Sequence, residues 1–187
     1  MARPRNFDEP TVLERARDLF WERGYAATSI QDLEQRLGIK RSSLYSVFGS
    51  KRALYERTLK QYQADSLAHL RAHFAQIDDL REAVRAMFMQ AVDAQVHAPE
   101  RPRGCYLVGA TSELAAIDAD IFAFIADNRT VFVDILAEAI RRARPAADAQ
   151  ALANYLFTFY SGLQVTLKTG IDRAQLCAVV ETAVTVL

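Results

Sequence analysis

The sequence predicts an all-α protein, and three observations lead to this. Glycine (7 residues) and proline (5) are scarce in the 187 residues, and 51% of the residues are hydrophobic, enough to form a core. Apolar residues recur three or four positions apart, which is the helical period. We find no alternating strand pattern, internal repeat or low-complexity tract. The expected fold is a small N-terminal three-helix domain followed by a larger helical domain.

The first predicted helix begins near Pro10 and ends at Gly24. Its inner face repeats at helical spacing and consists of Val12, Ala16, Leu19 and Phe20. Either Thr28 or Ser29 is expected to cap a second helix of about two turns, because a hydroxyl can accept a hydrogen bond from an N–H of the first turn. The inner face of this helix consists of Ile30, Leu33 and Leu37.

A third short helix follows a tight turn at Gly38 and Ile39 and ends at Gly49. It carries Leu44, Val47 and Phe48 inward. Two short helices joined through a glycine turn form a helix-turn-helix. Ser50 is expected to cap a long fourth helix that continues into the mid-70s.

The remaining helices are predicted at residues 79–97, 105–116, 118–143, 148–168 and 172–186. The breaks between them fall at Pro99, Pro102 with Gly104, Pro145 and Gly170. The last two helices are unusually apolar, with Leu163 and Val180 among their face residues. Such a pair needs a partner surface, and a second copy of the chain is the simplest one. We therefore expect a homodimer formed through residues 148–187.

The stretch from Ala149 to Leu167 carries no charge but is not expected to span a membrane. A stripe of polar residues runs along one side of it, with Asn154, Thr158 and Gln164 among its members. No secretory signal is expected at the N-terminus. Cys105 and Cys177 lie too far apart in the chain to suggest a disulfide framework. The expected location is the cytoplasm.

Positive charge is concentrated near the N-terminus although the net charge is zero. Residues 1–60 contain 12 Lys/Arg and 8 Asp/Glu, a balance of +4, and residues 61–187 contain 11 and 15, a balance of −4. Residues 35–52 hold five cations and no acid: Arg36, Lys40, Arg41, Lys51 and Arg52. Such a local field predicts an anionic partner.

The segment from Thr28 to Lys51, TSIQDLEQRLGIKRSSLYSVFGSK, carries a hydroxyl helix cap, a glycine turn, a Leu-Tyr pair and a phenylalanine three residues after the tyrosine. It resembles the DNA-binding domain of the TetR/AcrR family of transcriptional regulators over about residues 10–56. The resemblance implies a DNA-binding domain at 1–56 and a signal-sensing and dimerisation domain at 57–187. It also implies double-stranded operator DNA as partner, a small-molecule, oxidant or electrophile inducer, and repression. No cofactor is expected.

The resemblance assigns phosphate contacts to Tyr45 and Lys51, and Thr28 at a helix N-terminus is expected to hold another phosphate. Base reading is expected from the exposed side of the third helix, where Arg41 can bind guanine through two hydrogen bonds. The other residues expected to contact DNA there are Lys40, Ser42, Ser43 and Ser46. Lys40 stands where relatives often have a capping serine, so a helix start at Ser42 is an alternative. Arg3 and Arg5 form either a solvated arm or a minor-groove contact.

The sequence is also compatible with two other classes of protein. The second hypothesis is a helical ligand-binding or interaction protein without operator function, and the third is an enzyme. We find no nucleophile elbow, phosphate loop or dinucleotide fingerprint that would carry catalysis. His69 and His73 have metal-ligand spacing on a helix, but the arginine between them and the missing glutamate favour a solvated face.

Cys105 is either a redox sensor or a packing residue. It follows Arg101, Arg103 and Gly104 and is expected at a helix N-terminus, where a thiolate is stabilised. Cys177 is expected to pack. Aromatic and methionine residues gather in the middle of the chain, and some of them are expected to line a ligand cavity. They are Met87, Phe88, Met89, Tyr106, Phe122, Phe124, Phe132, Tyr155, Phe157, Phe159 and Tyr160.

Overall fold

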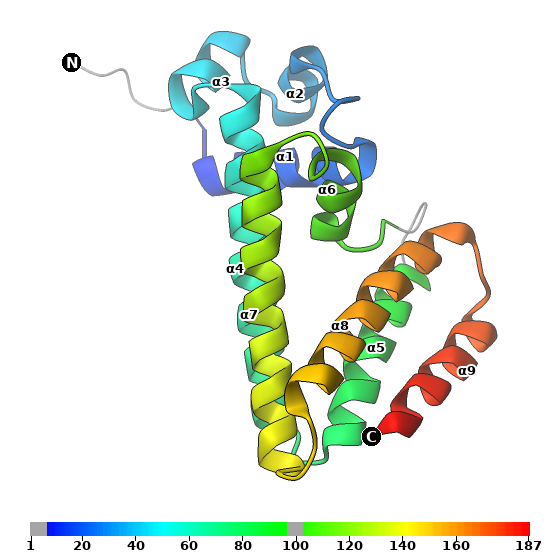
Figure 1. Cartoon of the computed structure of the whole chain (residues 1–187). Helices are drawn as coiled ribbons and strands as arrows, with labels where there is room; N and C mark the ends of the chain where they lie inside the picture. The colour runs from blue at the N-terminus through cyan, green and yellow to red at the C-terminus, as the bar shows by residue number, and fades with distance from the viewer. Residues whose placement is uncertain (1–6, 97–102) are drawn as a thin grey trace. The chain divides into compact units, whose positions relative to one another are not determined.

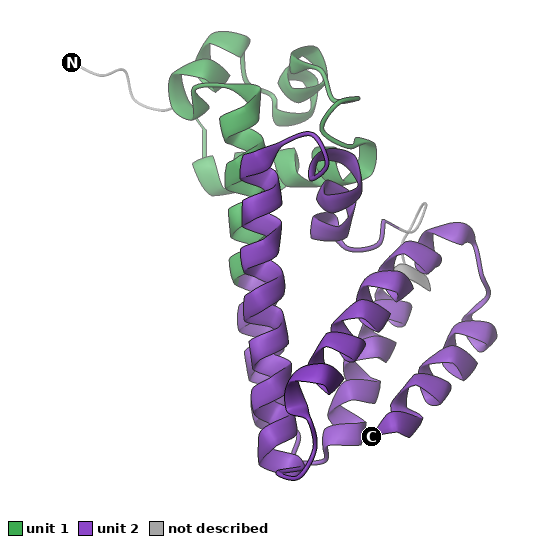
Figure 2. Ribbon diagram, in the orientation of Figure 1, with its two compact units in different colours: residues 1–64 green, residues 65–187 purple. Residues whose placement is uncertain are grey.

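The computed structural model describes residues 7–96 and 103–187, and throughout these ranges the regular structure is helical. The all-α prediction is confirmed (Figure 1). The chain divides into two compact units, residues 1–64 and 65–187 (Figure 2). The expected functional boundary near residue 56 stays a prediction. The arm with Arg3 and Arg5, and the breaks at Pro99 and Pro102, lie outside the described residues.

The first unit contains α1 (Glu9–Arg23), α2 (Ile30–Leu37), α3 (Arg41–Phe48) and the beginning of α4 (Lys51–Gln76). Asp8 caps α1 by accepting the N–H of Thr11 at 3.1 Å. Gly38 ends α2 in the left-handed region at φ +69°, a conformation that costs glycine little. The predicted inner faces of α1 and α3 are confirmed, except that Val47 is only half-buried.

The core of the first unit contains an aromatic group. Tyr55 of α4 is 1% exposed and packs edge-on against Phe20, with ring centroids 5.0 Å apart. Tyr25 follows α1 and lies 4.8 Å from Tyr55, centroid to centroid. Leu33 of α2 and Leu44 of α3 are also completely buried. The short helices α2 and α3 are thereby fixed by packing, since helices of two turns are not stable by themselves.

The second unit contains the rest of α4 and five further α-helices: α5 (Leu80–Val96), α6 (Tyr106–Leu114), α7 (Ala119–Ala143), α8 (Ala149–Thr166) and α9 (Arg173–Ala183). Short 3₁₀ turns, η1 (Leu167–Thr169) and η2 (Val184–Val186), follow α8 and α9. Each predicted helix is present with bounds that differ by a few residues. Among the described residues, no helix has the length and apolar character that crossing a membrane requires.

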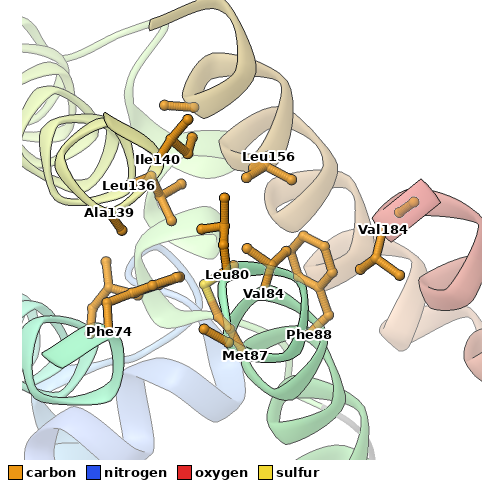
Figure 3. Close-up of a cluster of buried hydrophobic side chains, with 14 of the residues drawn as sticks. Phe74, Leu80, Val84, Met87, Phe88, Leu136, Ala139, Ile140, Leu156 and Val184 are labelled. Atoms are coloured by element: carbon orange, nitrogen blue, oxygen red, sulfur yellow. The ribbon is translucent and has the colours of Figure 1, made fainter. Parts of the chain in front are cut away.

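The core of the second unit is built from residues of all its long helices. Figure 3 shows Phe74 of α4, Val84 and Phe88 of α5, Ile140 of α7 and Leu156 of α8 within one apolar cluster. Phe88 also contacts Phe159, with ring centroids 4.7 Å apart.

The burial of the last two helices corrects one expectation. Leu163 of α8 and Val180 of α9 were expected on a surface for a second chain, but they are 4% and 0% exposed and belong to the chain's own core. The exposed large apolar residues of these helices and of η2 are Tyr155, Val165, Val179 and Val186.

Candidate DNA-binding surface

Helix α3 has one buried face and one exposed face. Leu44 and Phe48 are buried, whereas Arg41, Ser42 and Ser46 are exposed and Ser43 is half-buried. Lys40, exposed just before the helix, is its N-cap residue. The helix therefore begins at Arg41, and the alternative start at Ser42 is wrong. The side chains expected to read bases share the solvent-facing side of one short helix.

The N-terminus of α3 is capped from the preceding helix. Lys40 makes no side-chain cap, because an ammonium group cannot accept a hydrogen bond. Instead, the Oε1 atom of Glu34 in α2 accepts the backbone N–H of Arg41 at 2.5 Å. Glu34 was not among the residues predicted from the sequence. Two features of the sequence could have revealed it. The residue just before α3 has a side chain that cannot cap the helix, and the last turn of α2 carries a carboxylate.

Two of the side chains predicted to contact DNA lie against aromatic rings. The Nζ atom of Lys51 lies 4.2 Å from the centre of the Tyr25 ring, and the guanidinium carbon of Arg41 lies 5.4 Å from that of Tyr45. A cation over an aromatic face is favourable by about 0.5–1 kcal/mol at exposed sites. The Tyr45 hydroxyl, on a half-buried side chain, makes no hydrogen bond within the described residues. It can donate to a phosphate without breaking an internal bond.

The basic run is partly neutralised by acids from outside it. Arg36 lies 3.7 Å from a carboxylate oxygen of Glu22 in α1, and Arg52 lies 2.5 Å from one of Glu56 in α4. Within the described residues, Lys40 and the guanidinium of Arg41 form no ion pair. The positively charged surface is therefore smaller than the sequence suggested, and it includes the start of α3.

Thr28 does not occupy the position expected of a phosphate contact. Its side chain is 0% exposed and its hydroxyl donates to the carbonyl of Gly24 at 2.7 Å. Ser29 caps α2 instead: its Oγ accepts the N–H of Asp32, and the Asp32 carboxylate accepts the N–H of Ser29. The Ser29 hydroxyl also donates to this carboxylate at 2.6 Å, and this hydrogen bond, together with the one from the Ser29 N–H, lowers the pKa of Asp32 below its usual value. In this conformation Thr28 joins the end of α1 to α2.

In the second unit, the Gly104–Cys105 junction is packed against helix α8. Cys105 is half-buried and is the N-cap residue of α6. Gly104 adopts φ +63°, and a Cβ atom there would lie 2.5 Å from the backbone oxygen of Gln164 and 2.7 Å from Cε of Lys168. Lys168 is a second residue that was not predicted from the sequence, because it lies 63 positions after Cys105. Arg101 lies outside the described residues.

Tyr160 of α8 adjoins the same junction. Burial raises its pKa, as does the electrostatic influence of Cys105, while a hydrogen bond with Gln164 opposes the rise. The Tyr160 ring also packs against Phe132 of α7, with centroids 5.4 Å apart. Cys177 is half-buried on α9.

The two histidines of the metal-like spacing contact backbone carbonyls. Nδ1 of His69 lies 2.7 Å from the oxygen of Asp65, and Nε2 of His73 lies 2.7 Å from that of Ala83. Among the described side chains, no three His, Cys, Asp or Glu residues gather as a metal site would require. A cavity of about 310 Å³ lies between the ends of α4 and α7 and the beginning of α5, and Phe74, Leu80 and Arg142 are among its lining residues. The mid-chain aromatic residues do not line it.

Comparisons with known proteins agree with the interpretation of this surface as a DNA-binding one. The family described as bacterial regulatory proteins, tetR family, matches residues 12–58, which span α1–α3 and the start of α4. An uncharacterized HTH-type transcriptional regulator of Bacillus subtilis, YezE, is 31% identical over the whole of both chains. The chain belongs to the TetR family of transcriptional regulators. This TetR-family protein is a DNA-binding regulator, as its motif predicts, and the family consists of regulators, not enzymes.

Two other relatives extend the comparison. The HTH-type transcriptional repressor ComR of Escherichia coli is 26% identical, covering 96% of this chain and 89% of ComR. A cysteine mutant of the TetR-family regulator CifR, solved with a 26-bp operator duplex, is 31% identical over 98% of both chains with a TM-score of 0.84. The likeness to CifR covers both units of this TetR-family chain.

Proposed function

We propose that this regulator is a cytoplasmic homodimeric repressor that binds a palindromic operator and is released by an inducer acting on its second unit. The observation that carries the proposal is the start of α3, where the exposed side chains of Lys40 and Arg41 form no ion pair within the described residues. The operator complex of the CifR mutant and the repressor ComR support it by similarity.

The contacts divide into two classes. Tyr45 and Lys51 hold phosphates and position the protein, whereas Arg41 reads a base edge, helped by the exposed serines Ser42 and Ser46 together with Ser43 and Lys40. Tyr45→Phe is then expected to weaken binding to all sequences alike. Arg41→Ala is expected to relax preference at one base pair in each half-site, by about 1–3 kcal/mol.

The proposed dimer uses the outer sides of α8 and α9. Tyr155, Gly162 and Val165 are exposed at helical spacing on α8, and Val179 and Val186 are exposed along α9 and η2. A Cβ atom at Gly162 would meet nothing within 4 Å in the single chain, so this position leaves space for a close approach of another helix. Two helix-turn-helix units read one palindrome when they are held about 34 Å apart. A two-fold dimer presents two identical units to the two halves of such a palindrome.

The proposed signal acts through Cys105 or through a ligand bound among the helices of the second unit. With hydrogen peroxide, the Cys105 thiolate attacks one oxygen, a sulfur–oxygen bond forms, the oxygen–oxygen bond breaks, and the departing hydroxide takes up a proton to become water. Sulfur is oxidised by two electrons as the peroxide is reduced. With an electrophile that carries a carbon–carbon double bond next to a carbonyl group, the thiolate instead forms a sulfur–carbon bond as the π bond of the alkene breaks, and the neighbouring carbon takes up a proton. Either adduct adds bulk where Gly104 already closely contacts Gln164.

A mobility-shift experiment with duplex DNA flanking its own gene tests the repressor proposal. Binding to this duplex and not to a scrambled one is expected, with release by peroxide in wild type but not in Cys105→Ser, and Cys177→Ser as control. Release of Cys105→Ser as readily as wild type assigns the cysteine to packing and favours an apolar inducer. Absence of specific binding favours the alternative of a helical ligand-binding or interaction protein.

A further inference from the structure

Glu34 connects the two helices of the helix-turn-helix through both its backbone and its side chain. Its carbonyl oxygen accepts the N–H of Gly38 at 3.0 Å, which closes the last turn of α2. Its Oε1 accepts the N–H of Arg41 at 2.5 Å, which opens the first turn of α3. One residue therefore ends the first helix and begins the second, across a turn of three residues.

This arrangement replaces a missing helix cap. The first N–H groups of a helix have no partner within the helix, and a side chain of the N-cap residue usually accepts one of them. Lys40 cannot do so, and its own carbonyl accepts the N–H groups of Ser43 and Leu44. The carboxylate of Glu34 supplies the side-chain acceptor. Its negative charge is also favoured at the positive end of the α3 dipole.

We propose that Glu34 is a positioning residue for operator recognition, holding the first turn of α3 in the orientation from which Arg41 reads DNA. The part of this inference that concerns DNA binding rests on the proposed function, whereas the capping of α3 does not. Glu34 is half-buried and carries the same sign of charge as DNA, so it is not a phosphate contact. Glu34 orders the first turn of α3 before DNA binds. The conformational entropy of this turn is therefore not lost on binding, which favours the specific complex.

The test compares Glu34→Ala with Glu34→Gln in the full-length protein. Both remove one negative charge, but the glutamine oxygen can still accept the N–H of Arg41. Residue-resolved hydrogen exchange by NMR is expected to quicken by about fivefold at Arg41 in the alanine variant and by much less in the glutamine variant. Equal exchange in the two variants would overturn the capping role.

The DNA arm uses the duplex that flanks the gene and a scrambled duplex of the same length. Both variants are expected to bind the scrambled duplex slightly and equally more tightly, because each loses a negative charge. Selectivity for the operator duplex is expected to fall about fivefold in Glu34→Ala and to be retained in Glu34→Gln. Equal selectivity in the two variants would overturn the positioning role of the Glu34 side chain. A wild-type protein that does not distinguish the duplexes would refute the proposed function while the exchange result still decides the cap.

A rescue separates capping from general damage to the fold. Lys40→Ser places a hydroxyl acceptor at the N-cap of α3. Combined with Glu34→Ala, it is expected to slow exchange at Ser42 and Ser43 relative to Glu34→Ala alone, because a hydroxyl at the N-cap accepts the N–H of the second or third helical residue, although it removes a cation and lowers DNA affinity. A double variant that exchanges as fast there as Glu34→Ala alone would overturn the proposal.

Discussion

Replacing Lys51 by alanine is expected to change the salt dependence of DNA binding in a defined way. Each neutralised phosphate contributes about 0.9 to the slope of log affinity against log salt concentration. A two-fold dimer carries two copies of Lys51, so the slope is expected to shrink by about 1.8. Between about 50 and 200 mM salt, a fourfold range, the wild-type affinity then falls about twelvefold more than that of Lys51→Ala. A monomer on DNA would give a difference of about 3.5-fold.

The neighbouring Arg52 provides the matched control. Arg52→Ala also removes one cation from the first turn of α4, but Arg52 is paired with Glu56 at 2.5 Å. Its slope is expected to stay close to that of wild type. Fluorescence anisotropy over a series of salt concentrations measures all three slopes. Thermal unfolding checks the fold, because Lys51→Ala also loses the contact with Tyr25, worth about 0.5–1 kcal/mol. Equal slopes for wild type and Lys51→Ala would refute the phosphate assignment.

Three further changes test the assembly, the cap of α2 and the core of the first unit. Val165→Asp or Val179→Asp is expected to give monomers in analytical ultracentrifugation, since both side chains are exposed in the single chain; a persisting dimer would place the interface elsewhere. The lowered pKa of Asp32 means that its carboxylate contributes stability above the usual value of 3.8 and loses it as the pH falls through the lowered value. The difference in Tm between about pH 5 and pH 3 is therefore expected to be smaller in Asp32→Asn, and an unchanged difference would contradict the assignment. Leu44→Ala removes a fully buried side chain and costs about 2–5 kcal/mol, against roughly 3–10 kcal/mol for a unit of this size. DNA affinity is expected to be lost with the mass in solution unchanged, and a variant that keeps its affinity would show that the helix tolerates the cavity.

The helices and the recognition motif could be predicted because their signals are local. Helical periodicity located the inner faces of α1 and α3, and Gly24, Gly38 and Gly49 marked the ends of the first three helices. The hydroxyl cap, the glycine turn, the Leu44-Tyr45 pair and Phe48 together indicated the TetR family. In each case the determining contacts lie within a few residues of each other, so the sequence pattern records them directly.

The environment of several functional side chains could not be predicted, because it depends on contacts between different helices. The sequence by itself determined the helices, the glycine turn, the basic run and the family. Only the tertiary structure decided that Glu22 of α1 pairs with Arg36 of that run, and that Val180 faces the core while Val179 faces outward. It also decided that Thr28 is buried and that Glu34 caps α3. The physical reason is that periodicity shows which residues of a helix share a face, but burial and pairing depend on what the fold places against that face.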